Sequence, residues 1–69
     1  MEMVDLKKAI AAAISAEYAV VTARHDLAFA FCYGAQPDEV AAQVMARNAA
    51  QQRIIKLERL RDYYSGKGM

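Results

Sequence analysis

A single break interrupts a chain that otherwise lacks helix-breaking residues over most of its length. The only proline, Pro37, and the first of three glycines, Gly34, both fall in the run Tyr33-Gly34-Ala35-Gln36-Pro37 of this 69-residue sequence. Glycine suits the left-handed position just past a helix end, and proline suits the first position of a new helix. The break therefore predicts one helix before it, a left-handed Gly34, and a second helix that begins at Pro37.

The segments on either side of the break are rich in Ala, Leu, Gln, Arg and Lys, which favour helix. Asp5 is an acceptable N-cap for the first helix, and Asp38 and Glu39 suit the first turn of the second. We predict helices at about 5–32 and about 37–63, a turn at 33–36 and a flexible tail at 65–69. Since so short a connection makes the helices antiparallel neighbours, the expected fold is an all-α helical hairpin forming one domain over 1–69.

The first predicted helix carries two apolar stripes. The small stripe consists of alanines at helical spacing: Ala9, Ala12, Ala16, Ala19, Ala23 and Ala30. The large stripe contains Leu6, Ile10, Ile14, Val20, Val21, Leu27 and Phe31. The second predicted helix has a matching small seam: Ala42, Ala46, Ala49 and Ala50. Because small side chains let helix axes approach closely, we expect the hairpin to close partly through its alanine faces, with the large stripe partly uncovered. The alternative is that the large stripe forms the hairpin's own core.

An uncovered stripe of large apolar side chains would be a binding surface, because soluble monomers rarely expose one. A two-helix unit also has little interior, so extra burial from a second protein or a second copy is expected. The candidate protein-binding residues are Leu6, Ile10, Ile14, Val21, Leu27 and Phe31.

Two charged residues, Glu17 and Arg24, interrupt the large stripe. They are seven residues apart, too far to pair along one helix. In a hairpin that turns at 34–37, residues whose numbers sum to about 71 face each other, which brings Glu17 close to Arg53. A Glu17–Arg53 bridge is one hypothesis, and contact between Glu17 and a partner is the other.

The residues that catalysis or metal binding requires do not form a recognisable set. One histidine, His25, and one cysteine, Cys32, have no spacing that suggests a metal site or a nucleophile with its base, and a single cysteine forms no intrachain disulfide. No phosphate-binding loop occurs. We expect a protein that is not an enzyme, has no cofactor or small-molecule substrate, and works without a membrane. The lone cysteine and the acidic N-terminus, which is unlike a signal peptide, favour a cytoplasmic location.

Charge is distributed unevenly along the chain. The net charge is +1, but residues 47–67 hold six basic and two acidic residues, a net +4. The simplest interpretation is a solvated helix face with basic residues toward the helix C-terminus. The alternative is a homodimeric four-helix bundle that regulates nucleic acid, which it would bind through Arg53, Lys56, Arg59 and Arg61.

The layout resembles the small co-chaperones of bacterial type III secretion needle subunits. The resemblance rests on two helices of similar length, the break from Tyr33 to Val40, and apolar residues toward the end of the second helix: Ala49, Ile54, Leu57 and Leu60. It implies a hairpin that binds a helical-repeat chaperone, the pair keeping the needle subunit monomeric in the cytosol before export. The expected function is therefore a small helical adaptor or co-chaperone that docks another protein. A small phage structural or inhibitor protein is a third possibility.

Overall fold

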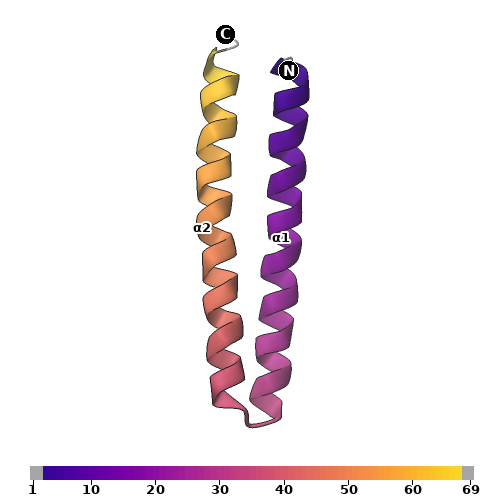
Figure 1. Cartoon of the computed structure of the whole chain (residues 1–69), viewed down its shortest axis with the longest axis vertical. Coiled ribbons are helices and arrows are strands. Elements are labelled where there is room, and N and C mark those ends of the chain that lie inside the picture. The colour runs from indigo at the N-terminus through magenta and orange to yellow at the C-terminus, as the bar shows by residue number, and fades with distance from the viewer. Residues whose placement is uncertain (1–2, 68–69) are drawn as a thin grey trace.

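The computed structural model describes residues 3–67, which form two long helices packed side by side. Helix α1 (Met3–Tyr33) and helix α2 (Pro37–Lys67) run antiparallel and meet at one short turn (Figure 1). The predicted all-α hairpin is confirmed. The molecule measures 51 × 15 × 15 Å, a rod only two helices thick. Because a rod of this kind has little interior, most side chains remain in contact with solvent.

The turn caps α1 with a pair of backbone hydrogen bonds typical of the Schellman motif. The amide N–H of Gln36 donates to the carbonyl of Phe31 at 3.0 Å, and the amide N–H of Ala35 donates to the carbonyl of Cys32 at 3.1 Å. The left-handed residue in this motif is Ala35, with φ of 55°, and Gly34 has no positive φ. The prediction of a left-handed Gly34 is therefore wrong, because the helix continues one residue further before the chain reverses.

The start of α2 follows the sequence prediction. Pro37 is its first residue, Asp38 and Glu39 lie in its first turn, and the carbonyl of Gln36 accepts from the amides of Glu39 and Val40 at 3.1 and 3.0 Å.

The other helix ends differ from the predicted ones. Helix α2 continues to Lys67, so it includes residues 65–67 of the predicted tail, while 68–69 lie outside the described residues. Gly66 alone does not end the helix, since a single glycine costs only about 1 kcal/mol there. At the other end, α1 begins at Met3, which places Asp5 in the first turn instead of at the cap.

The core follows one seam along each helix, with positions spaced alternately by three and four residues as in an antiparallel coiled coil. Five residues are buried: Ile10 (4% exposed), Ile14 (8%), Ala28 (9%), Ala50 (0%) and Ile54 (5%). The same seams include half-buried Val21 and Phe31 on α1, and Val40 and Leu57 on α2. We call these the interior seams.

The expectation that α1 closes against α2 through its alanine stripe is wrong. All six of those alanines are exposed, whereas Ile10 and Ile14 of the large stripe are buried. Each buried methylene contributes about 0.8 kcal/mol, so turning the isoleucines inward removes more apolar area from water than turning the alanines inward. On α2 the small seam divides, with Ala50 buried, Ala46 half-buried, and Ala42 and Ala49 exposed.

Candidate protein-binding groove

Four of the six residues predicted to bind a partner, Ile10, Ile14, Val21 and Phe31, lie on the interior seam of α1, whereas Leu6 and Leu27 lie beside it. Ile10 and Ile14 are buried in the hairpin's own core, and Leu6, Val21 and Phe31 are half-buried. Leu27 is the most accessible of the six, at 40% exposed. Their role in binding another protein stays a prediction, but the structure gives most of them a first role in holding the two helices together.

Two pairs of polar residues join α1 and α2 along the interior seams. The Nε of Arg53 donates to Glu17 Oε2 at 2.9 Å, which confirms the predicted bridge. Nearer the turn, Arg24 Nη1 donates to Gln43 Oε1 at 3.0 Å. Both pairs join residues on opposite helices, so they favour this alignment of α1 against α2 over a shifted one.

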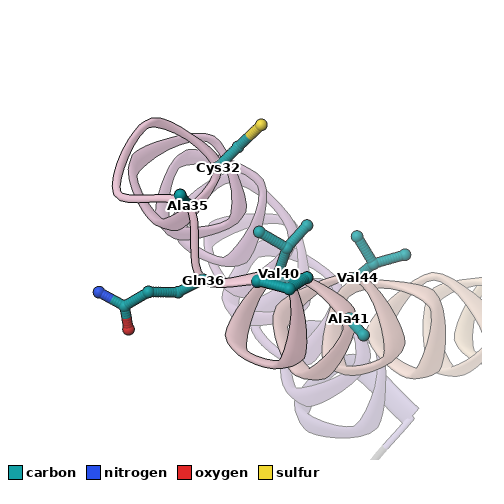
Figure 2. Close-up of a pocket in the computed structure, with 7 residues that line it drawn as sticks. Cys32, Ala35, Gln36, Val40, Ala41 and Val44 are labelled. Atoms are coloured by element: carbon teal, nitrogen blue, oxygen red, sulfur yellow. The ribbon is translucent and has the colours of Figure 1, made fainter.

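An apolar hollow of about 450 Å³ lies where the hairpin turns (Figure 2). The side chains of Cys32, Val40 and Val44 point to the same side of the hairpin, whereas the Gln36 amide points away from them. The full lining is Cys32, Ala35, Gln36, Pro37, Val40, Ala41 and Val44. The walls of this turn hollow are therefore aliphatic groups and one thiol.

A second hollow, of about 370 Å³, lies along the same side of the hairpin at mid-length. Its lining is Tyr18, Val21, Gln51, Gln52, Ile54, Ile55 and Glu58. Lining residues of the two hollows lie fourteen positions apart on the same helix. The pairs are Tyr18 and Cys32 on α1, and Ile54 and Val40, and Ile55 and Ala41, on α2. Fourteen residues are two heptads, and residues at this spacing lie on the same face of a helix. The two hollows are therefore aligned, and at a rise of 1.5 Å per residue they are about 21 Å apart. We call the two hollows and the surface between them the docking groove.

Arg47 lies midway along the docking groove, seven residues after Val40 and seven before Ile54 on the same interior seam. Its Nε is buried and has no hydrogen-bond partner among the described residues, and its Nη2 makes only a long contact of 3.3 Å to Asn48 Oδ1. A buried donor without a partner costs about 1–3 kcal/mol.

The opposite wall of the groove at this level carries His25, an exposed residue seven positions from both Tyr18 and Cys32. The middle of the groove is therefore polar on both helices. The turn hollow is apolar, whereas the second hollow combines apolar Val21, Ile54 and Ile55 with polar side chains.

The four basic residues considered for nucleic-acid binding do not act as one group. Arg53 is paired with Glu17, and Arg61 Nε lies 3.4 Å from Asp62 Oδ1. Lys56 and Arg59 are exposed. With two of four guanidinium or ammonium groups beside a carboxylate, the structure offers no particular observation in favour of a phosphate-binding face.

Within residues 3–67, no group of three or more His, Cys, Asp and Glu side chains could hold a metal ion. Neither described helix has a stretch long and apolar enough to cross a membrane. Comparisons with protein families, curated proteins and solved structures found no match to this chain.

The docking groove could not be recognised from the apolar stripes of either helix alone. The groove is built jointly by both helices, and its signal is a repeat at a spacing of fourteen. That signal is visible in the sequence as the pairs Val40/Ile54 and Ala41/Ile55, but only once the interior seams are known.

Proposed function

We propose that this hairpin is a non-enzymatic adaptor that binds an amphipathic helix of another protein along its docking groove. The observation that carries the proposal is the pair of aligned hollows, one apolar and one of mixed polarity, with half-buried Arg47 midway between them. A helix laid in a groove is recognised through apolar anchors that repeat on one of its faces. The two hollows of the docking groove would each receive one such anchor.

The spacing of the groove defines the chemistry of the partner helix. Anchors that reach both hollows must lie about 14 residues apart, since the hollows are about 21 Å apart and a helix rises 1.5 Å per residue. A carboxylate about seven residues from each anchor would then lie beside Arg47. The pattern is a large apolar residue, an acidic residue at i+7, and a second large apolar residue at i+14.

A synthetic helical peptide of about 20 residues with Leu, Glu and Leu at these positions tests the proposal. We expect saturable binding to the full chain by isothermal titration calorimetry. Val44→Asp, which places a charge in the turn hollow, should weaken binding at least about tenfold, because an unpaired charge is costly to bury.

The matched control is Met45→Asp, which makes a similar change at the next residue, on a side chain that is 72% exposed and outside both hollow linings. It should leave the affinity within about twofold, as expected for an exposed site away from the contact. Circular dichroism of both variants verifies that the hairpin is intact. Equal weakening by both substitutions, or no binding of the peptide to the unmodified chain, would contradict the proposal.

A narrower form of the proposal is a co-chaperone of a type III secretion needle subunit, acting in the cytoplasm. Its support is the resemblance in helix length and turn, together with an exposed free thiol at Cys32 that suits a reducing compartment. Co-expression with a helical-repeat chaperone and a needle subunit of such a system should then give a soluble complex of all three chains. If the needle subunit polymerises as readily with the hairpin as without it, this narrower form is wrong while the groove itself remains testable by the peptide.

A further inference from the structure

A second apolar seam runs the length of α1, outside the docking groove and outside the core. Its members repeat at alternating steps of three and four: Leu6, Ala9, Ala13, Ala16, Val20, Ala23, Leu27 and Ala30. None carries a charge, and none is buried in the hairpin. At 3.6 residues per turn, this outer seam lies about 100° around α1 from the interior seam. A helix with two seams at that angle occupies the corner of a four-helix bundle.

The outer seam of α1 is complementary to itself under two-fold symmetry. Suppose that two copies of α1 run antiparallel and that the two-fold axis crosses them at the level of residue 18. Outer-seam residues whose numbers sum to 36 then face each other. This pairing places Leu6 against Ala30, Ala9 against Leu27, Ala13 against Ala23, and Ala16 against Val20. Every large side chain meets an alanine of the other copy, so both backbones can approach closely without a clash or a void.

The same symmetry produces a similar match on α2. Its outer seam pairs residues whose numbers sum to 102: Ala42 faces Leu60, Ala46 faces Lys56, and Ala49 faces Arg53. The long stems of Lys56 and Arg53 can cover an alanine while their charged ends reach solvent. Arg53 is already paired with Glu17 of its own chain.

The pairing of α1 requires a two-fold axis at the level of residue 18, and the pairing of α2 requires one at the level of residue 51. A single axis relates both pairs of helices only if these two residues lie at the same level of the hairpin. The observed cross-helix pairs show that they do. The residue numbers of the Glu17–Arg53 pair sum to 70, and those of the Arg24–Gln43 pair sum to 67. Residues of α1 and α2 at the same level therefore have numbers that sum to about 67–70, which places residue 18 level with about residues 49–52. The two complementary pairings, derived separately for α1 and α2, therefore share an axis.

The exposed area of the chain matches what such an association needs. The accessible surface is 5106 Å² for a mass of 7.6 kDa. A compact monomer of that mass exposes about 4,300 Å². The excess of about 800 Å² equals the area that each partner buries in a standard interface.

We propose that two copies of this chain associate through their outer seams into an antiparallel four-helix bundle with two-fold symmetry. The bundle leaves the docking groove of each copy free, because the groove lies on the other side of the hairpin. The inference goes beyond the adaptor function and does not depend on it.

Sedimentation equilibrium of the full chain tests the association, with helicity followed by circular dichroism. We expect a dimer in the micromolar range. Ala16→Glu, at the centre of the outer seam, should raise the dissociation constant at least about tenfold by burying a charge against Val20 of the other copy. Ala11→Glu is the matched control, since Ala11 is also exposed on α1 but lies on the opposite side of the helix. It should leave the dimer unchanged. A monomeric unmodified chain, or equal loss of dimer in both variants, overturns the proposal.

The antiparallel orientation has its own test at Ala12, which borders the outer seam. In the proposed dimer Ala12 lies near Asp26 of the other copy, twice by symmetry. Ala12→Lys should therefore tighten the dimer, and Ala12→Glu weaken it, each on the order of threefold. Asp26→Ala should abolish the difference between the two variants. A parallel dimer places residue 12 against itself, so both charges would weaken it equally, and that result overturns the antiparallel arrangement.

Discussion

At the turn, the left-handed conformation falls on Ala35, with φ of 55°, although a glycine precedes it. An L-residue with a Cβ pays roughly 1–2 kcal/mol in that conformation, whereas glycine adopts it freely. Gly34 has no positive φ, and a Cβ built on it would meet its nearest neighbour, Gln36 Nε2, at 3.4 Å. The order of these two residues is therefore the reverse of the one that suits the turn best.

Exchanging the two residues, as Gly34→Ala with Ala35→Gly, should stabilise the hairpin by about 1 kcal/mol at constant composition. Urea denaturation followed by circular dichroism measures the change. Gly34→Ala alone is the control and should have a small effect. A less stable exchanged variant would contradict the assignment of the left-handed residue.

The Glu17–Arg53 bridge should couple the two helices measurably. With Arg53 half exposed, the interaction is worth about 0.5 kcal/mol. A double-mutant cycle with Glu17→Ala and Arg53→Ala should show this coupling in the free energy of unfolding, and added salt should reduce it. The cycle of Glu17→Ala with Arg59→Ala is the control, and equal coupling in both cycles would show that the bridge is not specific.

Arg47 illustrates a conflict between stability and binding at a single residue. Arg47→Met removes the buried Nε that lacks a partner and keeps an apolar side chain, so the free hairpin should gain about 1 kcal/mol. The same change should remove the preference for a peptide with Glu over one with Gln at the central position. Urea denaturation and calorimetry measure the two effects. A less stable variant would mean that Arg47 stabilises the free hairpin. Arg47 would then not be an unsatisfied group that selects an acidic residue of the partner.

Two adjacent isoleucines show how the helices are oriented about their axes. Ile54 is 5% exposed and Ile55 is 41% exposed. Ile54→Ala should lower the free energy of unfolding by about 2 kcal/mol or more, while Ile55→Ala should cost less than about 1 kcal/mol. Urea denaturation of both variants compares them directly. Equal losses would mean that α2 is rotated relative to the described interior seam.

Much of this architecture could be predicted from the sequence, because its signals are local. Pro37 and the acidic residues after it define the start of α2, and the short connection requires antiparallel neighbours. The register also followed from the chain, since the turn position alone brings Glu17 near Arg53.

The choice of the inner stripe could not be predicted in the same way. Both stripes of α1 have helical spacing, and only the comparison of buried areas across both helices favours the isoleucines over the alanines. The left-handed residue was also misplaced, since Gly34 and Ala35 differ by one position and helix ends are rarely defined more closely than that.

At the scale of the whole molecule, the proposed partner site and the proposed dimer interface lie on different sides of the hairpin. The docking groove on one side has an apolar hollow and a hollow of mixed polarity around a polar centre, and the outer seams on the other side are uncharged on α1 and self-complementary on both helices. A rod of 51 × 15 × 15 Å has few other ways to bury apolar area. We therefore expect that binding a partner helix and pairing with a second copy do not compete.

Light scattering coupled to size-exclusion chromatography, on the full chain mixed with the synthetic Leu–Glu–Leu peptide, tests this claim most directly. We predict a complex whose mass equals two chains and two peptides, eluting at the same position for any excess of peptide. A complex of one chain and one peptide, formed as the dimer dissociates, would show that both partners use the same face and would contradict the account.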